Sequence, residues 1–139
     1  MIITDTGAFI ALLSERDEDH AIAQQAFIEL SEGFITTYPV LTETCYLLAR
    51  SVGQTAARAF LQSIVRNAAE VFHLQNSHLD RMIVLMKKYE DLPMDFADAS
   101  LVLLAEELGH GRILTTDRRD FSVYRWRDTQ SFENLLLSN

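Results

Sequence analysis

The stretch that decides the fold is Ile2-Ile3-Thr4-Asp5-Thr6-Gly7-Ala8-Phe9-Ile10. Its first three residues are apolar or β-branched, and they predict a short buried strand that ends at Asp5. The residues from Thr6 onward then open an apolar helix through Phe9, Ile10 and two leucines. The pattern is therefore a strand, a turn and a helix, with a carboxylate at the junction.

Working outward, the rest of the chain repeats this alternation. Further strands are predicted at 34–36, 70–74 and 113–115, with a fifth at 123–124, and helices at 18–30, 39–52, 55–67, 77–89 and 95–108. Hairpin dipeptides such as Asn-Gly are absent, so the strands are expected to run mainly parallel, with helices on both faces of the sheet. No linker or repeat divides the chain, which predicts a single domain over residues 1–139.

Composition narrows the class of protein. The 12 Lys and Arg against 20 Asp and Glu give a net charge of −8, which argues against a protein that coats nucleic acid nonspecifically. The longest apolar stretch, 99–105, is too short to span a bilayer. A single cysteine, Cys45, excludes an internal disulfide framework, and the N-terminus does not resemble a signal peptide. We therefore expect a soluble cytoplasmic protein that does not bind membranes.

Four acids occupy positions that favour a shared site. Asp5 and Asp117 follow predicted strands, Glu43 lies one turn after Pro39 in a predicted helix, and Asp98 lies in the first turn of another. Ligands of parallel sheets bind at the carboxyl ends of strands. Carboxylates brought together there repel one another unless a hard cation such as Mg²⁺ or Mn²⁺ lies between them. Such a cation activates water and neutralises phosphate, which suffices for phosphodiester hydrolysis.

The same residues carry a family resemblance. The stretches are Ile3-Thr4-Asp5-Thr6, Leu41-Thr42-Glu43, Phe96-Ala97-Asp98-Ala99 and Leu114-Thr115-Thr116-Asp117-Arg118-Arg119-Asp120-Phe121. In order and spacing they resemble the successive motifs of PIN domains, particularly VapC-type toxins. The resemblance implies a three-layer α/β/α sandwich and an endoribonuclease dependent on Mg²⁺ or Mn²⁺. It also implies a homodimer, RNA as substrate, and a cognate antitoxin that blocks the site.

Particular residues receive roles from this resemblance. It implies Asp5, Glu43, Asp98 and Asp117 as both the catalytic residues and the metal ligands. Contacts to RNA are expected from Thr6, Thr115, Arg118 and Arg119, since the two arginines follow a ligand-bearing loop and lie in a local basic patch with Arg112, Arg125 and Arg127. Asp95 and Asp120 are interpreted as helix caps, although Asp95 could also join the metal site.

Other interpretations are weaker. A PIN-like module that binds RNA or a partner without cutting remains the main alternative, although the presence of all four acids argues against it. Asp5-Thr6-Gly7 also occurs in aspartic proteases, but these enzymes are all-β. The four histidines lack the spacing of a zinc site, and Cys45 has no histidine nearby in the sequence. An Asp-centred phosphotransfer domain would need a lysine after a late strand, where this chain has Thr115-Thr116-Asp117.

Overall fold

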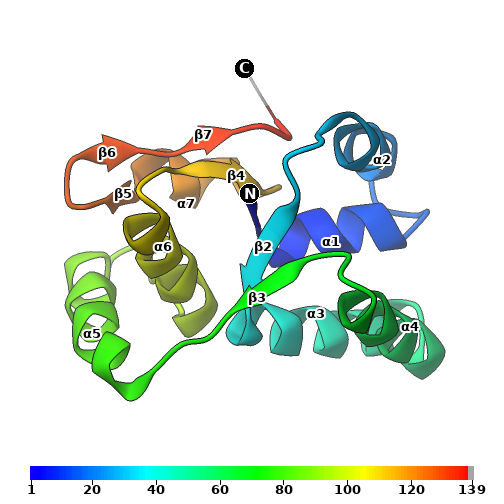
Figure 1. Cartoon of the computed structure of the whole chain (residues 1–139), viewed down its shortest axis with the longest axis horizontal. Helices are drawn as coiled ribbons and strands as arrows, with labels where there is room; N and C mark the ends of the chain where they lie inside the picture. Colours follow the sequence, from blue (N-terminus) through cyan, green and yellow to red (C-terminus); the bar gives the residue numbers. More distant parts are fainter. Residues whose placement is uncertain (138–139) are drawn as a thin grey trace.

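The computed structural model, which describes residues 1–137, has a five-stranded parallel sheet at its centre (Figure 1). The strand order is β3-β2-β1-β4-β7. The strands are β1 (Ile2–Thr4), β2 (Phe34–Thr37), β3 (Glu70–Phe72), β4 (Arg112–Leu114) and β7 (Glu133–Asn134). The predicted α/β class with a mainly parallel sheet is confirmed.

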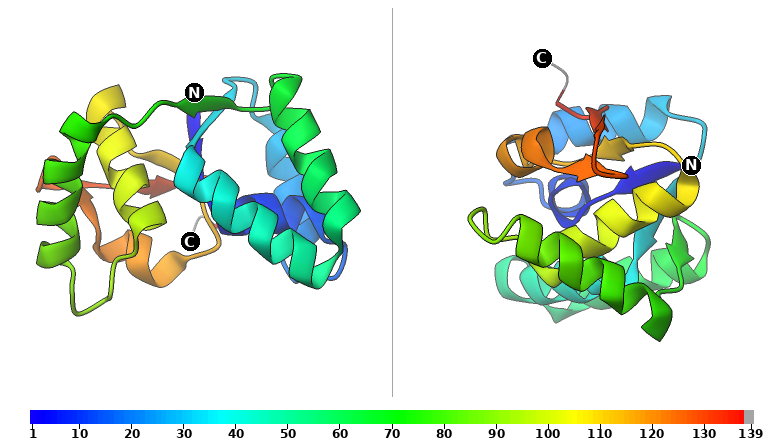
Figure 2. Two further views of the ribbon diagram at one scale, coloured as in Figure 1. Left: turned by 90° about the horizontal axis from the view of Figure 1, so that it is seen from below. Right: turned by 90° about the vertical axis from the view of Figure 1, so that its left-hand side faces the viewer.

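Helices lie on both sides of this sheet. They are α1 (Thr6–Leu13), α2 (His20–Glu29), α3 (Tyr38–Ser51), α4 (Gln54–Val65), α5 (Leu79–Lys88), α6 (Phe96–Leu108) and α7 (Arg118–Val123), with a 3₁₀ turn η1 (Asn76–His78) before α5. Apolar side chains of α3 to α6 belong to the cluster on one face of the sheet, and alanines of α1 and α2 belong to the cluster on the other face; Figure 2 shows the helices around the sheet. The three-layer arrangement expected from the sequence is therefore present.

Alternation along the central strands separates two apolar clusters. Ile3 and Ile113 belong to the larger one, which contains the apolar side chains of α6, whereas Ile2 and Leu114 belong to a smaller one with the alanines of α1 and α2. Successive side chains of a strand point to opposite faces, so both faces of β1 and β4 must be covered. All four of these side chains are fully buried.

The predicted strand at 123–124 is wrong. Val123 ends α7, a helix that the sequence analysis did not predict, and the fifth strand of the main sheet is β7. Between them, β5 (Arg125–Trp126) and β6 (Gln130–Ser131) form a separate antiparallel hairpin. Its turn residues Arg127 and Asp128 have φ of 47° and 65°, in the left-handed region that Asn-Gly turns usually occupy. The hairpin has these backbone angles without the Asn-Gly or Asp-Gly dipeptide that usually predicts such a turn.

The junctions of strands with helices place acids at one edge of the sheet. Asp5 caps α1, Asp95 caps α6 and Asp117 caps α7, each with a side-chain oxygen that accepts a backbone N–H of its helix. Strands β1 and β4 are parallel neighbours, and the Asp5 amide donates to the Leu114 carbonyl at 3.0 Å. The two chain segments that leave these strands therefore start side by side.

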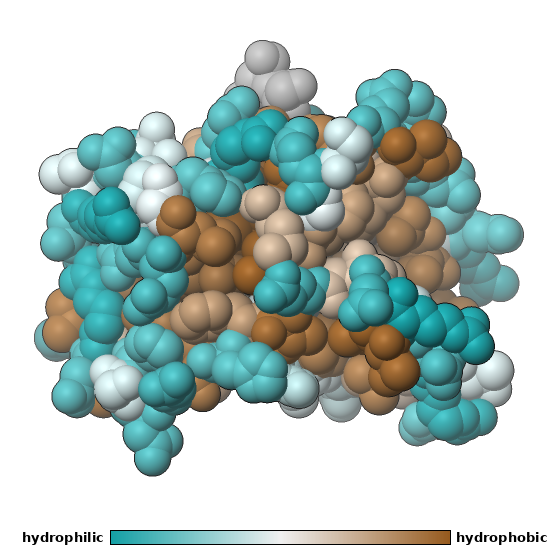
Figure 3. Space-filling view, viewed as in Figure 1, coloured by the Kyte–Doolittle hydropathy of each residue, from teal (hydrophilic) through white to brown (hydrophobic). Residues whose placement is uncertain are grey.

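The molecular surface is polar at its margins and apolar at its centre in the view of Figure 3, which has the same orientation as Figure 1. Some apolar side chains are strongly exposed, such as Val65 on α4 at 74% and Ile83 on α5 at 63%. Within residues 1–137, no helix combines the length and the hydropathy that crossing a bilayer requires.

Candidate active site

An acidic cleft of about 420 Å³ opens at the carboxyl ends of β1 and β4. Helix α1 starts in it, and the second turn of α3 and the first turns of α6 and α7 contribute acids to its walls. The carboxylates that line it are Asp5, Asp17, Glu43, Asp95, Asp98, Asp117 and Asp120. All four acids predicted as the site are thus in one cleft, although they are separated by up to 112 positions in the sequence.

Asp5 is held rigidly at the floor of the cleft. Its Oδ1 accepts the Thr6 amide at 2.7 Å and its Oδ2 accepts the Thr115 hydroxyl at 2.8 Å. The same hydroxyl accepts the Asp117 amide at 3.0 Å, so one threonine connects two of the acids. The side-chain amide of Asn134 donates to the Thr115 carbonyl at 3.0 Å, so β7 is hydrogen-bonded to the segment that holds Asp5 and Asp117.

Burial changes the chemistry of these carboxyls. Asp5 is only 7% exposed, and burial, together with the charges of Glu43 and Asp117, raises its pKa to about 6 despite its two hydrogen bonds. Burial also raises the pKa of Asp98 to about 8, with further contributions from the charges of Asp95, Asp5 and Asp117. Removing these groups from water disfavours their ionised forms, and neighbouring negative charges add to that effect.

Three carboxylates are close enough to share one ion. Asp98, Asp117 and Asp120 each present an oxygen, and these oxygens lie within 4.8 Å of one another. Burial and the nearby Asp117 raise the pKa of Asp120. Asp120 was interpreted from the sequence as a helix cap, but Asp117 is the cap of α7 and accepts the Asp120 amide at 2.9 Å. The sequence signal for Asp120 was its spacing of one helical turn from Asp117.

Within residues 1–137, the lining of this cleft has no positive side chain to balance its carboxylates. Among the residues that the structure describes, none of those lining it is a lysine, arginine or histidine, and only Asp120 approaches an arginine, at 3.9 Å from Arg119. The Thr6 hydroxyl, which also lines the cleft, is buried without a hydrogen-bond partner. A dense set of oxygen donors without positive side chains fits a hard divalent cation and fits zinc or a soft metal poorly.

Comparisons with known proteins identify the family and the fold. The model of the PIN domain family matches residues 2–126, which is most of the chain. This chain is a PIN-domain protein of the VapC type. It is 31% identical over 124 residues to ribonuclease VapC26 of Mycobacterium tuberculosis, covering 89% of this chain and 92% of that protein. The crystal structure of M. tuberculosis VapC20, a Sarcin-Ricin loop cleaving toxin, matches with a TM-score of 0.80 at 22% identity, over 86% of this chain and 92% of that one.

The predicted acids of this PIN domain differ in their positions. Asp98 and Asp117 are in the group of three, while Asp5 lies on the floor and Glu43 lines both the cleft and an adjoining apolar hollow of about 480 Å³. Asp95 accepts the Asp98 amide at 2.8 Å, as expected of a cap, and it also lines the cleft.

The residues expected to contact RNA divide into two kinds. Arg118 and Arg119 are exposed on α7 beside Asp117, where they are free to meet a phosphate. Thr115 is fully buried, and its hydroxyl is used to orient Asp5 and Asp117, so the expected substrate contact gives way to a structural one. Thr6 is 4% exposed and lines the cleft.

The remaining arginines of the predicted basic patch have internal partners. Arg112 pairs with Glu32, and Arg125 donates to the carbonyls that end α7. Arg127 donates to the Glu106 carbonyl at 2.8 Å. The basic patch inferred from the sequence is therefore reduced to Arg118 and Arg119.

Proposed function

We propose that this PIN-domain protein is an endoribonuclease that depends on Mg²⁺ or Mn²⁺ and acts as the toxin of a toxin–antitoxin pair. The observation that carries the proposal is the crowding of carboxylates without a compensating cation. Ionised Asp5 and Asp98 would be costly in this cleft, as their raised pKa values indicate, unless a divalent ion binds there. The name of the M. tuberculosis relative, a ribonuclease, supports RNA as the substrate.

The roles follow from position. Asp98 and Asp117 would hold the cation, and Asp5 would be a further ligand, directly or through water. Asp120 joins these proposed ligands because its carboxylate lies close to those of Asp98 and Asp117. Glu43, which also lines the cleft, would complete the shell or orient the attacking water. A bound divalent ion would neutralise phosphate charge and lower the pKa of a water. Arg118 and Arg119 would attract the RNA backbone toward the cleft.

The proposal extends to the whole chain and its partners. We infer that residues 1–139 form one PIN domain that works in the cytoplasm as a homodimer and is inhibited by a cognate antitoxin, as the VapC resemblance implies. Light scattering of the purified protein tests the dimer. Growth arrest on expression of the chain alone, relieved by its antitoxin, tests the pairing.

Asp117→Asn tests the activity. Asparagine retains the capping oxygen that accepts the Asp120 amide, so the variant should fold normally. It should bind RNA but cut it at least about a hundred times more slowly than the wild type in Mn²⁺. The matched control is Asp80→Asn, which changes an exposed acid on α5 outside the cleft and should cut at the wild-type rate. Absence of metal-dependent cleavage by the wild type on any RNA would instead favour a silent binding module.

A further inference from the structure

A buried tyrosine contacts one of the proposed ligands. The Tyr124 hydroxyl donates to Asp98 Oδ2 at 2.9 Å, and Tyr124 is fully buried. Among residues 1–137, Asp98 Oδ1 has no hydrogen-bond partner. One carboxylate oxygen is therefore fixed by the protein, and the other is left for a ligand. No local sequence signal connects these two residues, because 26 positions and a strand separate them.

The tyrosine ring cannot turn away from this contact. It packs edge to face against Tyr89, with ring centroids 5.0 Å apart, and against Phe121 at 5.1 Å. Arg125 directly follows Tyr124 in the chain, and its backbone amide donates to the Tyr89 hydroxyl at 2.9 Å. Both the side chain and the backbone at this point are thus fixed by aromatic packing and by a buried hydrogen bond.

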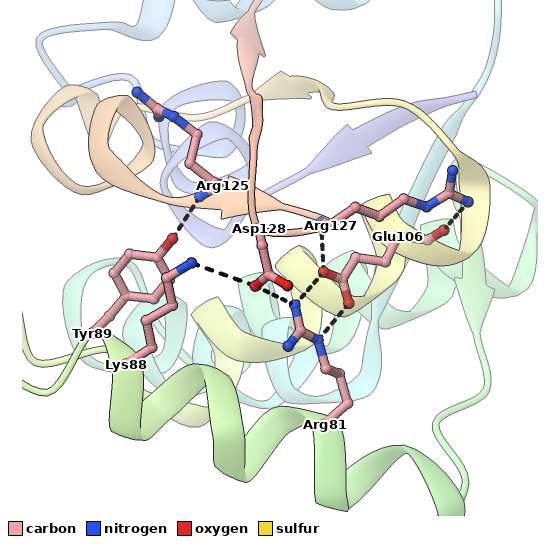
Figure 4. A network of polar contacts seen from close by, with 7 residues as sticks. All are labelled: Arg81, Lys88, Tyr89, Glu106, Arg125, Arg127 and Asp128. Carbon is pink, nitrogen blue, oxygen red and sulfur yellow. Dashed lines mark hydrogen bonds and ion pairs between the residues drawn. The ribbon is translucent and has the colours of Figure 1, made fainter.

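A set of ion pairs fixes the segment that follows. We call Arg81, Glu106, Arg127 and Asp128 the hairpin clamp (Figure 4). Arg81 binds both Glu106 oxygens, at 2.9 and 2.8 Å, and Asp128 at 3.0 Å, while the Arg127 amide donates to Glu106 at 2.7 Å. The clamp therefore holds the β5–β6 turn in its left-handed backbone conformation.

The clamp and the metal site share one rigid element. Glu106 lies about two turns after Asp98 on α6, and the single stretch from Tyr124 to Asp128 contacts both ends of that helix. A hydrogen-bonded partner that orients a metal ligand typically changes affinity by about 10-fold to 100-fold when it is removed. We propose that Tyr124 is a positioning residue, which sets the orientation of the Asp98 carboxylate for the cation; this inference rests on the proposed function.

Tyr124→Phe tests the inference, because it removes one hydroxyl and keeps the ring. Calorimetric titration with Mn²⁺ alone should show that the variant binds Mn²⁺ about 10-fold more weakly than the wild type. RNA cleavage at saturating Mn²⁺ should show kcat reduced and KM for RNA within about two-fold of the wild type, because the hydroxyl is buried away from the substrate.

Tyr89→Phe is the matched control. It also removes a buried hydroxyl from the same aromatic cluster, but that hydroxyl serves the Arg125 amide and does not contact a carboxylate. It should lower the melting temperature and leave Mn²⁺ affinity unchanged. Wild-type affinity in Tyr124→Phe, or an equal loss in both variants, would overturn the inference. Because Mn²⁺ binding needs no RNA, a wild type that cuts no RNA would refute the proposed function without affecting this result.

Discussion

The stability of the metal-free protein should be limited by Asp98, and its replacement by asparagine measures this directly. The pKa of Asp98 rises from 3.8 to about 8 on folding. A carboxyl with a raised pKa costs nothing below pH 3.8 and destabilises the native state progressively as the pH rises toward 8. The wild type in EDTA should therefore lose stability between about pH 4 and 8.

The size of the effect follows from the same shift. Each pH unit above 3.8 costs up to about 1.4 kcal/mol, which gives at most about 4 kcal/mol at pH 7. We expect Asp98→Asn to recover about half of this, roughly 2 kcal/mol, because Asp95 and Asp5 share the repulsion and the side chain is partly exposed. The amide oxygen of asparagine can still accept the Tyr124 hydroxyl.

Urea unfolding in EDTA at pH 5, 7 and 8.5 is the assay. Asp98→Asn should be more stable than the wild type by roughly 2 kcal/mol at pH 7 and by more at pH 8.5, and the difference should shrink to less than about 1 kcal/mol at pH 5. Addition of Mn²⁺ should stabilise the wild type by mass action and the variant much less. Asp80→Asn, which removes an exposed carboxylate on α5 outside the cleft, is the control and should change the pH dependence little. Equal pH dependence in wild type and Asp98→Asn would refute the reasoning.

Two further predictions concern RNA and packing. In the Asp117→Asn background, which keeps RNA intact, joint replacement of Arg118 and Arg119 by Ala should lower the slope of log Kd against log salt by about 1.4, whereas Arg58→Ala on α4 should not change it. An unchanged slope would mean that the two arginines do not touch phosphate. Gly7→Ala should destabilise the protein by about 1–3 kcal/mol, because its methyl group would collide with Thr116 Oγ1, and Thr116→Ala should restore most of the loss in a thermal melt. No rescue by the double variant would show that the cost lies in the helix itself.

Local sequence chemistry was enough for strands β1 to β4, for most helices and for the acids near their ends. Apolar runs such as Ile2-Ile3-Thr4 are buried on both faces in a parallel sheet, so they show up as short β-prone segments whatever their partners. Capping is equally local, because Asp95 and Asp117 satisfy amides only three residues away. Ligands of parallel sheets bind at the carboxyl ends of the strands, so the positions of Asp5 and Asp117 after strands were enough to predict that the two acids share a site.

Tertiary structure alone decided what surrounds these acids. Two arginines of the predicted basic patch have partners far along the chain, Glu32 for Arg112 and the Glu106 carbonyl for Arg127, and no local pattern reports those partners. The β5–β6 hairpin is held by the ion pairs of its clamp, so its turn needed no glycine. Asp120 and Tyr124 lie at the site because the chain after β4 brings α7 and the residue that follows it close to Asp98 of α6, and burial raises the pKa values of Asp98 and Asp120 there. The sequence by itself determined which groups could bind a cation; packing determined how they are oriented and how much their ionisation costs.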